Sequence, residues 1–118
     1  MRSIFGTIHW EGKPMNIVGI SACVAGIAHT YIAKKKLIQA GEQAGHKIHI
    51  ETQGTIGTED ALTPEEIEAA DIVVLAVDIQ IKGKERFDGK KIVEIPTEVA
   101  IHSPTALVKK LEEIAQKE

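Results

Sequence analysis

Residues 16–30, NIVGISACVAGIAHT, decide the fold, because an apolar β-branched run passes through a loop of small residues directly into a helix. The run 16–21 predicts a buried strand, and helical spacing begins after the small-residue segment 22–28. One face of this helix, expected to pack on a sheet, carries Ala33, Leu37, Ala40 and Ala44. Gly45 then predicts the end of the helix.

The next segment predicts an edge strand followed by a short helix. Residues 47–53 alternate isoleucine with polar residues, as a strand with one covered face does, and they end in a glycine-bearing turn at 54–57. Thr63 and Glu66, with proline directly after the threonine, have the form of a capping box. A helix is therefore expected to run to about Ala70.

The second half of the chain begins with the most apolar run, 72–77 (IVVLAV), which predicts a central strand covered on both faces. A loop over 78–90 leads to a fourth strand at 92–95, which is closed by Pro96. A last helix opens at Ser103. Its buried stripe is expected to be Leu107, Leu111 and Ile114.

Strands that alternate with helices in this way predict an α/β fold with right-handed crossovers. We expect a single domain over residues 16–118, built as a three-layer α/β/α sandwich around a four-stranded parallel sheet in the order 2-1-3-4. Residues 1–15 are expected to form an extension, either unstructured or upstream of the native start.

Composition excludes several classes of protein. The 118 residues are 43% hydrophobic and 26% charged, which is typical of a globular domain, and no apolar run approaches the roughly 18 residues of a membrane-spanning helix. The net charge of -3 and the aromatic content of 3% argue against a nucleic-acid partner. The first fifteen residues do not resemble a secretory signal, so we expect a cytoplasmic protein.

The one cysteine of the chain, Cys23, lies in the loop that joins the first predicted strand to the first predicted helix. Free backbone amides and the helix dipole at such a junction stabilise a thiolate and a bound phosphate. Small residues, above all Gly26, let the backbone close around a phosphoryl group. Spacing alone leaves a phosphoryl-carrying nucleophile and an inert buried cysteine equally open.

The motif Cys23-x-x-Gly26-Ile27-Ala28-His29-Thr30, followed by Glu51-Thr52-Gln53-Gly54, resembles the fructose-type enzyme IIB family of the phosphoenolpyruvate-dependent sugar phosphotransferase system. Further landmarks in the same order are Leu62-Thr63, the strand from Ile72 and Glu85-Arg86-Phe87. The resemblance runs from about residue 16 to the end of the chain. One departure is Val24, where family members often have proline.

The resemblance implies that Cys23 takes phosphate from a phosphohistidine of enzyme IIA and passes it to a sugar, by default fructose, that enters through the membrane component enzyme IIC. It also implies a phosphate-binding loop made of Val24, Ala25, Gly26, Ile27, Ala28, His29 and Thr30. No cofactor and no metal are expected, and the isolated module is expected to be a monomer that works at the membrane face through enzyme IIC.

For each side chain near Cys23 the sequence allows a functional and a structural interpretation. Candidates for docking a partner are Lys34, Gln53, Gly54 and Arg86, although a solvated helix face explains Lys34 and a turn explains Gly54. His29 and Thr30 either contact the phosphate or cap the helix. Asp78 follows the central strand at the same sheet edge and is either an acid or, more simply, a solvated loop residue. His46 and His49 lie three apart on a strand and make a poor metal pair.

Three other functions compete with a phosphoryl carrier. A small cysteine phosphatase needs an arginine six positions after the cysteine, and His29 stands there. A thiol redox protein needs a second cysteine, which the chain lacks. A non-catalytic binding module with a structural Cys23 leaves the small-residue loop unexplained.

Overall fold

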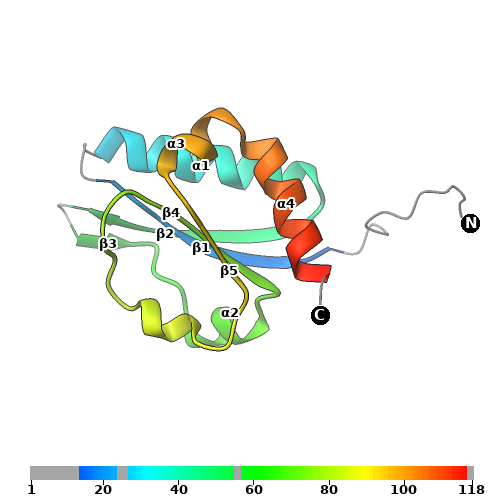
Figure 1. Cartoon of the computed structure of the whole chain (residues 1–118). Coiled ribbons are helices and arrows are strands. Elements are labelled where there is room, and N and C mark those ends of the chain that lie inside the picture. The colour runs from blue at the N-terminus through cyan, green and yellow to red at the C-terminus, as the bar shows by residue number, and fades with distance from the viewer. Residues whose placement is uncertain (1–13, 24–26, 55–56, 117–118) are drawn as a thin grey trace, which may run out of the picture.

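The computed structural model describes residues 14–23, 27–54 and 57–116, in which strands and helices alternate (Figure 1). The elements are β1 (Asn16–Ala22), α1 (Ile27–Gln43), β2 (Lys47–Gly54), β3 (Gly57–Glu59), α2 (Pro64–Ala69), β4 (Ile72–Val77), the 3-10 helix η1 (Lys84–Phe87), β5 (Ile92–Ile95), α3 (Thr97–His102) and α4 (Pro104–Gln116).

The sheet has five strands in the order β3-β2-β1-β4-β5. The four strands β2, β1, β4 and β5 are parallel and confirm the predicted order. The prediction that residues 47–53 form an edge strand was wrong, because β3 pairs with the outer side of β2 in antiparallel orientation. Gly57, at φ +104°, adopts a conformation that favours glycine and lets the chain return as a hairpin.

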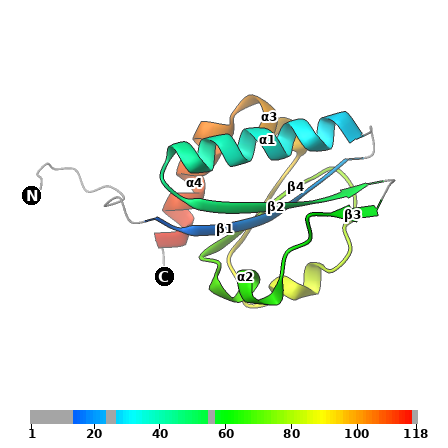
Figure 2. The ribbon, with the colours of Figure 1, turned by 180° about the vertical axis from the view of Figure 1, so that it is seen from behind.

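Helices cover both faces of the sheet and confirm the three-layer sandwich. α1, α3 and α4 lie on one face, and α2 and η1 lie on the other (Figures 1 and 2). Alternate β1 side chains divide between the two cores: Ile17 packs with Leu37 of α1, whereas Val18 and Ile20 pack with Ile67 of α2. The first five residues of β4 are buried, as expected for an inner strand.

Two helix starts and one helix end follow the predicted chemistry. Thr63 accepts a hydrogen bond from the Glu66 amide while the Glu66 carboxylate accepts one from the Thr63 amide, so the capping box is confirmed. The last helix begins at Pro104, and Leu107 and Leu111 are buried in it. Gly45, at φ +89°, follows the end of α1.

Two sequence expectations need correction, and one helix was not predicted. Ala44 is exposed and lies beyond the end of α1, which stops one residue earlier. Residues 97–102, for which no element was predicted, form α3, whose Ala100 is fully buried. Met15, which we counted with the N-terminal extension, is buried, and its amide donates to His46 Nδ1. The ordered core therefore includes Met15.

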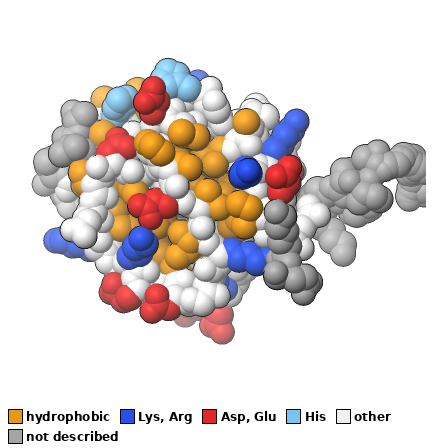
Figure 3. Space-filling model, in the orientation of Figure 1, with side chains coloured by type: hydrophobic (Ala, Val, Ile, Leu, Met, Phe, Trp, Pro, Cys, Tyr) orange, Lys and Arg blue, Asp and Glu red, His pale blue; other side chains and the backbone are white. Residues whose placement is uncertain are grey.

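The face seen in Figure 1 contains the free edge of the sheet at β5. Hydrophobic side chains gather near the middle of this face, with charged side chains among and around them (Figure 3). Ile92 of β5 is one of the large hydrophobic residues that are exposed. Within the described ranges, no helix combines the length and the apolar character needed to cross a membrane.

Candidate functional site

Cys23 directly follows β1 at the carboxyl edge of the sheet, where the sequence predicts the reactive loop. Its neighbours are set by strand pairing, because Ala22 lies opposite Gln53 on one side and Val77 on the other. The amide of Asp78 donates to the carbonyl oxygen of Ala22 at 2.9 Å. Cys23 is 7% exposed, so it is largely shielded from solvent.

The strand end and the start of α1 are held together by one buried hydrogen bond. The Ser21 hydroxyl donates to the Thr30 carbonyl oxygen at 2.8 Å. This bond fixes the first turn of α1 beside the strand that carries the thiol. In consequence, His29 Nδ1 lies 3.9 Å from Cys23 Sγ, a long but direct contact. Ser21 was not identified as a site residue, although a lone hydroxyl in an apolar strand was a usable signal.

Asp78 also belongs to the site. Its carboxylate accepts hydrogen bonds from the Thr97 hydroxyl at 2.6 Å and from the Thr97 amide at 3.0 Å. It also contacts the Cys23 thiol and lies near His29. The hydrogen bond from the Thr97 side chain is the main reason why the pKa of Asp78 lies below its usual range. The simpler interpretation of a solvated loop residue therefore misses its contacts with α3 and the thiol.

Thr30 is the next residue of α1 and is 4% exposed. Its hydroxyl is buried, and no described residue forms a hydrogen bond with it. Most buried hydroxyls in proteins have a partner, and an unsatisfied one costs about 1–3 kcal/mol. A buried hydroxyl of this kind is suited to bind an incoming polar group.

A pocket of about 320 Å³ opens beside the thiol. It lies between the β2–β3 hairpin and the segment after β4. The lining residues are Cys23, Gln53, Gly54, Gly57, Thr58, Ile79, Gln80 and Lys82. The predicted candidates Gln53 and Gly54 are therefore brought to the thiol.

Other parts of the predicted site are placed differently. Val24, Ala25 and Gly26 lie outside the described residues, while Ile27 begins α1 and Ala28 is exposed in its first turn. Lys34 Nζ forms an ion pair with Asp60 Oδ2 at 2.8 Å.

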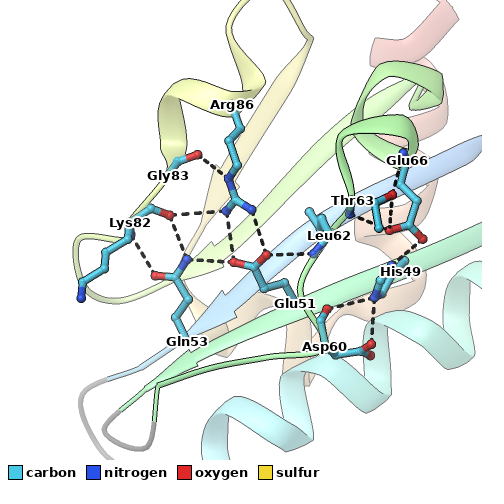
Figure 4. Close-up of polar contacts among 10 residues, drawn as sticks. All are labelled: His49, Glu51, Gln53, Asp60, Leu62, Thr63, Glu66, Lys82, Gly83 and Arg86. Atoms are coloured by element: carbon cyan, nitrogen blue, oxygen red, sulfur yellow. Dashed lines mark hydrogen bonds and ion pairs between the residues drawn. The ribbon is translucent and has the colours of Figure 1, made fainter.

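Arg86, predicted as a docking residue, forms a two-point contact with the buried Glu51 carboxylate (Figure 4). Gln53 also bonds to Glu51. The polar atoms of both predicted docking side chains are thus engaged within the molecule.

The arrangement combines a shielded thiol, an imidazole, a carboxylate, a buried hydroxyl and the start of a 17-residue helix. Such a set suits a nucleophilic sulfur that reacts with an anionic group. Among the described residues no group of three or more histidine, cysteine, aspartate or glutamate side chains is arranged to hold a metal ion.

Comparison with known proteins gives consistent matches. A family model described as "PTS system, Lactose/Cellobiose specific IIB subunit" matches residues 18–110. The PTS system fructose-like EIIB component 2 of Escherichia coli (strain K12) is 43% identical over 96 residues, which cover 81% of this chain and 91% of that protein. The PTS system fructose-specific EIIB'BC component of Xanthomonas campestris is 45% identical over 94 residues, which cover 80% of this chain and 16% of that longer protein.

A solved structure has the same fold. The crystal structure of a domain from the fructose-specific IIABC component of Borrelia burgdorferi superposes with a TM-score of 0.80 at 44% sequence identity. The match covers 86% of this chain and 96% of that domain. Sequence and structure therefore point to the same group of proteins.

Proposed function

Because the chain belongs to the IIB family of the phosphoenolpyruvate-dependent sugar phosphotransferase system, we propose that it relays a phosphoryl group on Cys23. The observation that carries this proposal is the placement of the thiol. Cys23 lies at a strand-to-helix junction, beside His29 and a pocket, and is shielded from bulk water.

The relay consists of two displacements at phosphorus. In the first, the Cys23 thiolate attacks the phosphorus of a phosphohistidine on enzyme IIA, so that an S–P bond forms, the P–N bond breaks and the imidazole leaves with the electron pair. In the second, a sugar hydroxyl oxygen attacks the same phosphorus, the S–P bond breaks, and the thiolate is regenerated while the hydroxyl proton is released. Each step exchanges one bond for another and needs no cofactor.

The residues around the thiol have distinct tasks in this scheme. Backbone amides at the start of α1 and the helix dipole stabilise the charge of the transferring group. Within the predicted loop, the buried Thr30 hydroxyl donates to a phosphoryl oxygen. His29 lies beside the thiol and lacks the forked donors of the arginine that cysteine phosphatases need. The loop therefore holds phosphate for a partner.

The partners and the sugar follow from the family. Enzyme IIA is the proposed phosphoryl donor, and enzyme IIC presents the sugar at the cytoplasmic face of the membrane. A partnership with enzyme IIC is supported by the name EIIB'BC of the longer relative, which joins B and C components in one protein. Fructose is the proposed sugar because relatives that are 43–45% identical are named fructose-like or fructose-specific.

The test supplies phosphoenolpyruvate with labelled phosphate, the general phosphotransferase proteins and the cognate enzyme IIA. We expect one label per chain, located on Cys23 by mass spectrometry, and no label on Cys23→Ser. His29→Gln is the matched variant, because it must still carry label on sulfur if the histidine only assists. A labelled Cys23→Ser protein would show that the phosphoryl group resides elsewhere and would overturn the proposal.

A further inference from the structure

The carboxylate of Glu51 is the most deeply buried acidic group of the structure described here, with 1% exposure in the middle of β2. The carboxylate accepts four hydrogen bonds. Two come from the Arg86 guanidinium at 3.0 and 3.1 Å, one from the Gln53 side-chain amide at 2.9 Å and one from the Leu62 backbone amide at 3.0 Å. Burial alone would raise the pKa of Glu51, but these donors outweigh burial and lower it. Glu51 is therefore an ionised anchor on the α2 face of the sheet.

This anchor holds the segment after β4 through Gln53 and Arg86. Gln53 grips the backbone of Lys82 at two points, since its amide group donates to the Lys82 carbonyl and its oxygen accepts from the Lys82 amide, both at 2.9 Å. Arg86 Nε donates to the Gly83 carbonyl at 2.7 Å. Figure 4 shows that Gln53 and Arg86 each bond both to this backbone segment and to the Glu51 carboxylate.

The segment held in this way is a wall of the thiol pocket. Lys82 lines the pocket together with Ile79 and Gln80, and Gln53 lies between this wall and the strand that carries Cys23. Gln53 also sits opposite Ala22, the residue directly before the thiol. A change in the Glu51 anchor is thus transmitted to the pocket wall through Gln53, which bonds to Lys82, and through Arg86, which bonds to Gly83 and Lys82.

We propose that Glu51 is a positioning residue that acts through Gln53 and Arg86, and that the three side chains together hold residues 79–82 in the form that receives the phosphoryl-bearing group at Cys23. The proposal rests on the proposed function of Cys23. It replaces direct partner docking by Arg86 and Gln53, because the polar atoms of both side chains are engaged inside the molecule. Neither residue touches the reacting sulfur in this scheme.

Two variants test the positioning role and one serves as control. Gln53→Met removes the two hydrogen bonds between Gln53 and the Lys82 backbone and leaves the Glu51–Arg86 ion pair intact. Arg86→Lys keeps the charge but loses the forked contact. The control is Lys84→Met, which breaks an exposed ion pair with Glu94. Lys84 belongs to η1, as Arg86 does, but it does not line the thiol pocket.

Phosphotransfer kinetics separate positioning from docking. For Gln53→Met and Arg86→Lys we expect the maximal rate of Cys23 phosphorylation to fall about tenfold, with the KM for phosphorylated enzyme IIA changed less than about threefold. A docking role predicts the reverse, a raised KM at an unchanged maximal rate. Rates are expressed per folded molecule, so a loss explained by unfolded protein counts against the proposal.

Two readouts do not depend on any partner. Amide hydrogen exchange at Lys82 should accelerate about tenfold in Gln53→Met and stay unchanged in Lys84→Met, because only the first variant removes the acceptor of that amide. The rate at which iodoacetamide alkylates Cys23 should change in Gln53→Met and Arg86→Lys and stay unchanged in Lys84→Met. If Cys23 of the natural chain is not phosphorylated, the proposed function fails. Hydrogen exchange and alkylation still test whether Gln53 and Arg86 hold residues 79–82 in place. Unchanged exchange, alkylation and transfer in both variants would overturn the inference.

Discussion

Thr30 and Asp78 show how single residues depart from ordinary protein chemistry around Cys23. Thr30 keeps a buried hydroxyl for which no described residue is a partner, and Asp78 puts a carboxylate against the thiol. Both groups lie at a thiol that also faces a pocket, an arrangement that a purely structural cysteine would not need.

The Thr30 hydroxyl leads to a prediction of opposite effects on stability and activity. Thr30→Val keeps the side-chain shape and removes the hydroxyl, so we expect the free energy of unfolding to rise by about 1 kcal/mol. Phosphorylation of Cys23 should slow about tenfold, because a donor to the phosphoryl group is lost. Urea denaturation and the phosphotransfer assay measure the two effects.

Thr30→Ser is the matched variant for this prediction. It keeps the hydroxyl and loses a methyl group, so it should retain most of the activity while becoming slightly less stable. Destabilisation by Thr30→Val would mean that the hydroxyl already has a partner in the folded chain.

At the scale of elements, the contact between β1 and β4 sets the position of the site. Gly19 lies in the middle of β1, and a Cβ atom there would lie 2.2 Å from the Val74 carbonyl oxygen of β4. Since backbone atoms cannot move aside cheaply, Gly19→Ala should force the two strands apart. We expect a loss of about 3 kcal/mol or more in the free energy of unfolding, measured by urea denaturation.

Gly54→Ala is the control for that variant. A Cβ atom at Gly54 meets nothing within 4 Å, and its φ angle is not in the left-handed region. Its unfolding free energy should change by less than about 0.5 kcal/mol. Equal effects of the two substitutions would show that strand separation is not the cause.

The elements that the sequence predicted well are those whose pattern is local. The apolar run of β4 and the capping box of α2 each combine a period and a cap within a few residues. β3 is three exposed residues without any apolar pattern, and it exists because the edge of β2 offers free hydrogen-bonding groups. α3 is only six residues long and depends on the distant Asp78 at its start.

The same division holds for the site. Cys23, His29 and Thr30 lie within one short motif, so the sequence places them together. The roles of Asp78 and Glu51 depend on contacts with residues 19 and 35 positions away. Such contacts depend on tertiary packing, and no local spacing reveals them.

At the scale of the whole molecule, His49 joins parts of the chain that are distant in sequence. Its Nδ1 lies 2.7 Å from Glu66 of α2, and its Nε2 lies 3.1 Å from Asp60 (Figure 4). Asp60 also pairs with Lys34 of α1. Partial burial alone would lower the pKa of His49, but the hydrogen bonds to Glu66 and Asp60 outweigh burial and raise it. The hydrogen bonds of His49 therefore connect β2 to the segment that follows the pocket hairpin.

A pH dependence of stability follows from that raised pKa. Because His49 binds its proton more tightly in the folded chain, its contribution is complete below the unfolded pKa of about 6.5 and is lost as the pH rises through the higher folded value. His49→Gln should lower the free energy of unfolding by roughly 0.5–1 kcal/mol at pH 6 and by less at pH 8.5. Urea denaturation across this range, with the exposed His102→Gln as control, measures the difference. A gap between the natural chain and His49→Gln that stays constant from pH 6 to 8.5 would contradict the assignment, since only a titrating imidazole makes it shrink.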